Sequence, residues 1–306
     1  MRTSCSRRHS RWTNFYLIGD ARITRGDTQI GIRMYDIERH RHHRHIYGGH
    51  DPGICACGVG ANAAWLTGHA DEALTLANRA IAISEKIEHP FSETLAWMWS
   101  TQAAWGVRDH KLARDRAEAL LRVSERHNFR QWVGLGMVVG GACRVQAGET
   151  DFGLKLVEEG LGQQRQFGHT SLQGYVNTTA ALAHLEVGSS GRALELLAEA
   201  LDVNAKSGAG VLHPETLRLH TETLHATRQI DLQQAIARIE KAVGLARQQG
   251  ALALEWRAAS ALARLHISTG QHDLARELLQ THFSASSEGF ESPDLVEGKQ
   301  LLNTLG

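Results

Sequence analysis

The sequence predicts an all-α protein built as a stack of about six helical hairpins. Three observations favour this fold class: the composition, a constant spacing of turns, and small residues at fixed places around each turn. Of the 306 residues, 42% are hydrophobic and only four are proline. Ala, Leu, Arg and Glu are used heavily, and these residue types lose little free energy on entering a helix. The chain is long enough for one or two globular domains or for one elongated array.

Turn-like stretches recur along the chain at an almost constant interval. The anchor residues of these turns are Gly68, Arg108, Gly148, Gly188, Ile230 and Gly270, which gives intervals of 40, 40, 40, 42 and 40 residues. A generic helical bundle has no reason to keep such a period, whereas stacked repeats do. The spacing therefore favours a repeat array with units of about 40 residues.

The residues at three fixed places in each unit are mostly small, and larger apolar residues stand between them at helical spacing. Small side chains let two helix backbones approach closely. We therefore expect each unit to be two amphipathic helices of roughly 14 to 18 residues joined by a short turn. The recurring positions lie seven residues before the anchor (Ala61, Thr101, Gly141, Ala181, Thr223, Ala263), five after it (Ala73, Ala113, Gly153, Ala193, Ala235, Ala275) and twelve after it (Ala80, Leu120, Gly160, Ala200, Ala242, His282).

This pattern resembles the tetratricopeptide repeat, which has a small residue midway along its first helix, a glycine at the turn and two alanines in its second helix. The resemblance covers residues 53 to about 284, and the period is longer than the usual ~34 residues. It implies a right-handed α-solenoid whose first helices line a concave groove. We expect the superhelix to occupy residues 46–290.

The two ends of the chain differ from the repeats. Residues 1–50 contain ten Lys or Arg against four Asp or Glu. We expect residues 1–45, which are basic and rich in His and Arg, to be a poorly ordered remnant of an upstream repeat, because Thr24, Gly26, Thr28 and Gly31 stand where a second helix would need Ala and Leu. Residues 291–306 are predicted to form a capping helix whose polar face closes the stack.

Three stretches resemble a narrower family. Residues 35–53, 246–259 and 288–295 are similar to the C-terminal repeat region of bacterial class III nucleotide cyclase–ATPase (STAND-type) signalling proteins. In that family a cyclase or DNA-binding domain precedes a regulatory ATPase, and the repeat array is the input or interaction module. The resemblance implies a scaffold for protein–protein or domain–domain interaction in bacterial signalling, or alternatively a detached regulatory fragment whose candidate partner is a cyclase or ATPase domain.

Motifs for catalysis are missing from the sequence. It contains no GxxxxGK[ST] phosphate loop, no paired aspartates of the cyclase type and no GxSxG nucleophile turn. We therefore expect no enzyme activity and no cofactor. A protein or a peptide is the expected partner.

Charge and cysteine usage narrow the class of protein further. Lys plus Arg and Asp plus Glu both number 33, so no global field recruits nucleic acid or an anionic membrane. No run of 18 apolar residues is present, and the start of the chain has no apolar signal region. The four cysteines show no disulfide framework and no CxxC motif. These features predict a cytoplasmic protein with reduced thiols.

A histidine-rich tract at residues 40–45 offers a different function, that of a metal-responsive protein. His50, Asp51, Cys55 and Cys57 stand close by and extend the possible ligand set. Neighbouring arginines oppose a tight site, and helical residues two apart point about 200° away from each other. We therefore expect no metal, and keep metal response as a second alternative.

The repeat register predicts which side chains line the groove. Its N-terminal half is neutral and its C-terminal half is basic. Arg257 and Arg264 lie two turns apart on one helix face, where they could take a carboxylate or phosphate, or could instead pair with Glu255 or other nearby acids. The predicted groove residues are Asn62, Met98, Gln102, Gln146, Tyr175, Thr178, Glu186, His220, Arg228, Arg257 and Arg264.

Overall fold

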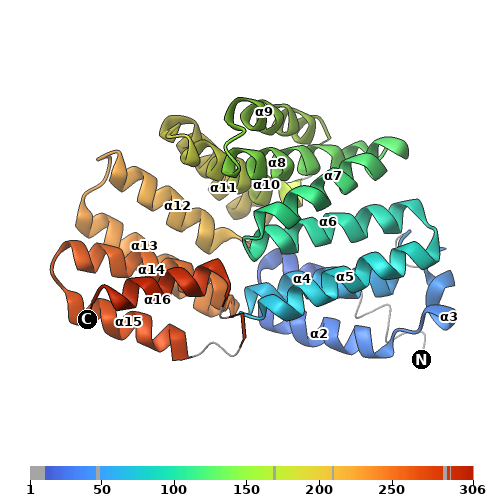
Figure 1. Cartoon of the computed structure of the whole chain (residues 1–306), viewed down its shortest axis with the longest axis horizontal. Coiled ribbons are helices and arrows are strands. Elements are labelled where there is room, and N and C mark those ends of the chain that lie inside the picture. Colours follow the sequence, from blue (N-terminus) through green and yellow to red (C-terminus); the bar gives the residue numbers. More distant parts are fainter. Residues whose placement is uncertain are drawn as a thin grey trace.

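The computed structural model describes residues 11–45, 49–167, 170–208, 210–284, 288–289 and 291–305. Within these ranges the regular structure is entirely helical (Figure 1). Residues 11–18 are helical. The later elements are α2 (Ala21–Met34), α3 (Ile37–His40), η1 (Arg41–His45), α4 (Pro52–Leu66), α5 (Ala70–Ile87), α6 (Pro90–Gly106), α7 (His110–Arg126), α8 (Arg130–Gln146), α9 (Thr150–Phe167), α10 (Thr170–Glu186), α11 (Ser190–Ser207), α12 (His213–Ala226), α13 (Leu232–Gln249), α14 (Leu252–Ser268), α15 (His272–Ser284) and α16 (Pro293–Asn303).

The helices from α4 to α15 pair in sequence as hairpins. In the described chain the pairs α4/α5, α6/α7, α8/α9, α10/α11, α12/α13 and α14/α15 each pack together, and each first helix also contacts the first helix of the next pair in most units. The all-α fold with about six stacked hairpins is therefore confirmed. Proline at the first helical turn and a side-chain cap fix several starts, as at α4, where Asp51 accepts from the amides of Gly53 and Ile54.

The turn inside each hairpin contains one residue in the left-handed region. These residues are Gly68, Arg108, Gly148, Gly188, Arg228 and Gly270. Five of them coincide with the predicted anchors, but the fifth anchor was wrong by two residues. Because α11 begins two residues after Gly188 whereas α13 begins four residues after Arg228, the two extra residues of the long interval follow the left-handed residue.

The recurring small positions lie at the contacts between paired helices. Every one of them whose side chain the structure describes is buried; that of His282 is not described. The closest approach is between α8 and α9, where Gly141 and Gly153 bring the two backbones together. Trp65 and Trp105, 40 residues apart, are likewise buried.

The head of the chain is more regular than we expected. Residues 11–18 and α2 form a further hairpin, and α2 packs against α4. Thr24 and Thr28 fit the buried face because their hydroxyls donate to the carbonyls of Asp20 and Thr24, and Gly31 leaves room for the ring of Trp12. The expected disorder therefore does not apply to residues 11–34; residues 1–10 lie outside the described part. The domain boundaries at 45/46 and 290/291 stay predictions.

The superhelix curves until its first and last units touch along a seam. The amide of Gly210 donates to the carbonyl of Leu17 at 2.7 Å, and the side chain of Leu252 lies over Gly68. Arg108 bonds Asp294 at 3.0 Å. Figure 1 shows the consequence: the blue N-terminal helices lie beside the orange and red C-terminal helices, and α4 contacts α14.

Candidate binding groove

A pocket of about 270 Å³ lies where the two halves of the superhelix face each other. The C-terminal ends of α6, α8 and α10 form one side of it, and α14 together with the N-terminal halves of α12 and α16 forms the other. Its lining is polar and strongly charged, with two tryptophans. The lining residues are Trp105, Arg108, His110, Gln146, Leu182, Glu186, Glu215, Arg218, Trp256, Arg257, Ser260, Arg264, Asp294 and Glu297.

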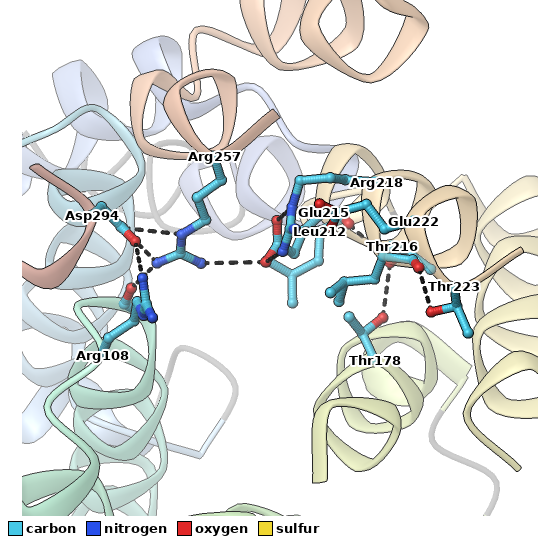
Figure 2. A network of polar contacts seen from close by, with 12 residues as sticks. Arg108, Thr178, Leu212, Glu215, Thr216, Arg218, Glu222, Thr223, Arg257 and Asp294 are labelled. Carbon is cyan, nitrogen blue, oxygen red and sulfur yellow. Dashed lines mark hydrogen bonds and ion pairs between the residues drawn. The ribbon is translucent and has the colours of Figure 1, made fainter. Parts of the chain in front are cut away.

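Glu215 is the most deeply buried carboxylate of the pocket (Figure 2). Both of its oxygens accept from the Arg218 guanidinium, at 2.8 and 2.9 Å, and Arg257 lies 3.7 Å away. Glu222, one turn further along α12, also accepts from Arg218. The spacing of these three residues, three and four apart, puts them on one helix face. A fork-to-fork pair of this kind holds both side chains in one orientation.

Glu215 and Arg218 each stabilise the charged form of the other. Burial by itself raises the pKa of Glu215, but the positive charges of Arg218, Arg257 and Arg108 outweigh it and hold the pKa at about 2. Burial likewise lowers the pKa of Arg218, and the carboxylates of Glu215 and Glu222 reverse this and raise it. Both groups are therefore ionised near pH 7.

Asp294, at the start of α16, connects the two sides of the seam (Figure 2). One carboxylate oxygen accepts from Arg257 Nε and Nη2 at 3.0 and 2.8 Å, and the other accepts from Arg108 Nη1 at 3.0 Å. Arg257 Nη2 also donates to the carbonyl of Gly106 at 2.7 Å, and its guanidinium lies 5.6 Å from the ring centre of Trp65. Asp294 thus joins helices that are almost 200 residues apart in sequence.

Glu297, one turn after Asp294, pairs with Arg108 at 3.0 Å and with Arg264. These contacts are partly open to solvent, because the side chains of Arg108, Arg264 and Glu297 are 39, 42 and 44% exposed. The pocket also contains polar atoms that have no hydrogen-bond partner among the described residues, namely Ser260 Oγ and His110 Nδ1. Burial, assisted by Arg108, lowers the pKa of His110, so its ring is neutral near pH 7.

Four of the predicted groove residues come together in this pocket. Gln146 Nε2 donates to Glu186 at 3.0 Å, on the side opposite Arg257 and Arg264. Arg257 pairs with Asp294 of α16 and lies 3.7 Å from Glu215 of α12, and Arg264 pairs with Glu297 of α16, whereas Glu255 pairs with Arg247. The two arginines thus pair with acids of the chain itself, and their contact with a ligand stays a prediction.

Five predicted groove residues are buried instead: Asn62, Met98, Gln102, Tyr175 and Thr178. The Asn62 amide donates to the carbonyls of Gly58 and Trp99, so it connects two neighbouring first helices. Thr178 similarly bonds Thr216 on α12.

Residues 11–18 explain why part of the inner surface is closed. The hydroxyl of Tyr16 donates to Gln102 at 3.2 Å, and its ring packs edge-on against Trp99. Trp12 Nε1 donates to the sulfur of Cys55. Since these residues lie against α4, α6 and the start of α12, the head of the chain fills the inner surface that the register assigned to a partner.

The last two predicted groove residues lie apart from the pocket. His220 contacts Arg238 on α13 at 3.0 Å. Arg228 is exposed in the left-handed turn before α13.

The structure adds five charged residues that the sequence reasoning did not include: Arg108, Glu215, Arg218, Asp294 and Glu297. For Arg108 a signal was present, because it stands where most units have a turn glycine. Glu215 and Arg218 share a helix face with a pairing interval. Nothing in the sequence marks Asp294 as the partner of Arg108 and Arg257, because that contact depends on how tightly the superhelix winds.

The candidate metal site and the cysteines that the sequence suggested do not form a second site among the described residues. Among the residues that the structure describes, no group of three or more His, Cys, Asp or Glu side chains is placed to hold a metal ion. Cys55, Cys57 and Cys143 are buried free thiols; Cys5 lies outside the described residues. No helix in the described part has the length and apolar character that crossing a membrane requires.

Comparison with known proteins now places the fold. Across its full length the chain superimposes on the crystal structure of a Rap protein complexed with Competence and Sporulation Factor, with a TM-score of 0.59, 8% identity and 98% of that chain covered. The chain is a tetratricopeptide-like α-solenoid. The solenoid also matches NprR in complex with its cognate peptide NprX, with a TM-score of 0.58, 13% identity, 97% of this chain and 81% of that chain.

Comparison of sequences finds only distant similarity. No protein-family profile matches the solenoid. An uncharacterized protein, R02095, of Rhizobium meliloti (strain 1021) is 25% identical over 265 residues, which are 86% of this chain. The solenoid spans only 26% of the length of that relative.

Proposed function

We propose that the solenoid is a non-catalytic binding module that takes a segment of a protein or a peptide at the arginine-lined pocket. The observation that carries this proposal is the pocket itself, which contains four arginines and two tryptophans and stays partly open to solvent. Arginine forks bind carboxylates in two-point contacts, and tryptophan supplies apolar area beside them.

The solved structures of similar fold support the same conclusion. One of them holds Competence and Sporulation Factor and another a cognate peptide. The identities of 8 and 13% make this a likeness of fold, so the ligand chemistry of the present chain has to be argued from its own pocket. Arg264 and Arg108 are the arginines most accessible to a ligand, at 42 and 39% exposure.

Selection from a random library of displayed peptides, with the purified full chain as bait, tests the proposal. Selected peptides are synthesised and their dissociation constants measured by calorimetry. We expect Arg264→Ala to weaken binding by about tenfold, corresponding to ~1.4 kcal/mol for one lost charged contact. Arg165→Ala is the matched control, because Arg165 is similarly exposed and pairs with Glu199 outside the pocket. Peptides that bind both variants equally, or a selection without binders, would contradict the proposal.

A second proposal places the solenoid in a longer signalling protein. The relative from Rhizobium meliloti is about four times as long as the matched segment, so the solenoid corresponds to one region of it. Together with the resemblance of residues 35–53, 246–259 and 288–295 to cyclase–ATPase repeat regions, this favours a regulatory array for a cyclase or ATPase domain. Inspection of the same and adjacent reading frames for a phosphate loop and a cyclase domain tests it. Absence of both from the genomic neighbourhood would count against this role.

A further inference from the structure

The C-terminal helix α16 lies on the pocket as a ligand would. Asp294 and Glu297 are three residues apart on its inner face. Their carboxylates form ion pairs with Arg108, Arg257 and Arg264. The indole of Trp256 donates to the carbonyl of Asp294 at 2.6 Å. Gly298 lies flat against the same indole, so closely that a Cβ there would come within 1.8 Å of the ring.

Both polar contacts and partly buried leucines hold α16 in place. Gly298 is the only buried residue between Pro293 and Asn303, all of which the structure describes. Leu295, Leu301 and Leu302 are partly buried against the cluster that includes Leu279. The half-exposed pairs of Glu297 each contribute little to stability, typically ~0–1 kcal/mol, whereas the paired side chains of Arg257 and Asp294 are only 15 and 12% exposed. A helix that supplies the same two carboxylates would restore these pairs, so exchange of α16 for such a helix leaves no arginine of the pocket without a partner.

Charge specifies what kind of segment could replace α16. Among the described residues that line the pocket, four arginines face four carboxylates, Glu186, Glu215, Asp294 and Glu297. Two of these carboxylates belong to α16. When α16 leaves, the remaining lining has two more positive than negative charges, and Arg108 and Arg264 lose their partners. An acidic segment restores the balance, whereas a neutral or basic one does not.

We propose that Arg108, Trp256, Arg257 and Arg264 form a receptor surface for an acidic helix with an Asp-x-x-Glu-Gly pattern, and that α16 is its resident occupant. A partner helix of the same pattern displaces α16 and binds in its place. This inference rests on the proposed function and adds the chemistry of the ligand. The pattern follows from three contacts: two carboxylates one turn apart for the arginines, and a glycine where the helix meets the Trp256 ring.

Fluorescence anisotropy with a labelled peptide of residues 291–305 tests the inference on the full chain. Two variants release the resident helix in different ways. Gly298→Leu pushes α16 away from Trp256 and keeps every charge, and the double variant Asp294→Asn, Glu297→Gln removes the ion pairs. We expect both variants to bind the peptide at least about tenfold tighter than the unaltered chain does. Gly162→Leu is the matched control, because Gly162 is an exposed helical glycine with open space around its Cα.

A second peptide, in which Asn and Gln replace Asp294 and Glu297, isolates the role of charge. It should bind every chain at least about tenfold more weakly than the acidic peptide does. Equal binding of the two peptides, or equal binding by the unaltered chain and both variants, would overturn the inference. If circular dichroism shows that neither variant folds, α16 is an integral part of the core and the inference also fails. Library peptides that still depend on Arg264 would then leave the proposed binding function standing.

Discussion

Gly141 in α8 and Gly153 in α9 pack backbone against backbone. A Cβ on Gly141 would lie 2.6 Å from the carbonyl oxygen of Gly153, and a Cβ on Gly153 would lie 2.7 Å from that of Gly141. Both distances are shorter than a van der Waals contact. The clashing atom belongs to the backbone, which cannot move away as a flexible side chain could. Gly134 of α8 and Gly160 of α9 make the same kind of backbone contact about two helical turns away. At the position of Gly153 the neighbouring hairpins have alanine, Ala113 and Ala193, so the α8/α9 pair approaches more closely by using glycine there.

Alanine at Gly141 or Gly153 should destabilise the protein. Overpacking of this kind costs about 1 to 3 kcal/mol, although alanine is the better helix former. Urea unfolding followed by circular dichroism measures the change. Gly162→Ala in the same helix is the control and should stabilise by roughly 0.5 to 1 kcal/mol, because nothing lies near its Cα. Equal effects of Gly153→Ala and Gly162→Ala would show that the close helix contact is wrong.

The two arginines in left-handed turns should respond differently to glycine. Arg228 and Arg108 have φ values of 58° and 63°, a region that glycine adopts without cost. We expect Arg228→Gly to raise the free energy of unfolding by roughly 0.5 to 1 kcal/mol. Arg108→Gly also removes the contacts to Asp294 and Glu297, so it should be less stable than Arg228→Gly by about 1 kcal/mol. Thermal unfolding of both variants measures this difference. If Arg108→Gly were more stable than Arg228→Gly, the contacts of Arg108 with Asp294 and Glu297 would be contradicted.

Glu215 should make the protein sensitive to acid. Its pKa is about 2 in the folded state against an ordinary value of 4.5, so its contribution to stability is complete above pH 4.5 and is lost as the pH falls towards 2. At ~1.4 kcal/mol per pKa unit, the loss is on the order of 3 kcal/mol. Urea unfolding at a series of pH values measures it. Glu215→Gln should lower stability near pH 7 by about 3 to 5 kcal/mol, because it leaves buried arginine charge behind.

The pH profile of Glu215→Gln carries the sharper test. Between pH 4.5 and 2 it should be flatter than the profile of the unaltered chain, since the titrating group is gone. Glu199→Gln, which removes an exposed carboxylate paired with Arg165, is the control and should keep the original slope. A slope that Glu215→Gln leaves unchanged would assign the acid sensitivity to other carboxylates.

Three thiols should be unreactive in the folded protein. Burial raises the pKa of Cys55 to about 11 and the pKa of Cys57 and Cys143 to about 12, so the thiolate is rare at pH 7.5. We expect iodoacetamide to label these residues in hours without denaturant and in minutes in guanidinium chloride, as measured by peptide mass spectrometry. Rapid labelling of Cys143 in the folded chain would show that α8 opens locally.

The sequence predicted the repeating part of the fold because each hairpin is a local object. Gly68, Gly148 and Gly188 mark turns through their own conformation, and Ala73 and Ala193 mark helix contacts through their own size. Neither inference requires knowledge of distant residues. The error at the fifth turn has the same origin, since Arg228 adopts the left-handed conformation without being glycine.

The groove was predicted only in part, because its composition depends on curvature. A small rotation per repeat, summed over several units, decides whether Arg108 meets Asp294 or faces solvent. Likewise, the pattern of Thr24, Thr28 and Gly31 gave no sign that residues 11–18 would cover Gln102. Arg257 and Arg264 were assigned to the groove by the repeat register, and their shared helix face could be read from their seven-residue spacing because that spacing is a local signal.

The contact between the first and last units changes how such an array comes apart. An open row of repeats frays from its two free ends, and each lost unit leaves the rest intact. Here Leu252 of α14 lies over Gly68, and α4 contacts α14, so neither the first nor the last hairpin can separate from the stack without breaking its contact with the other. We therefore expect the terminal contact and the stacked hairpins to unfold together, in one cooperative transition.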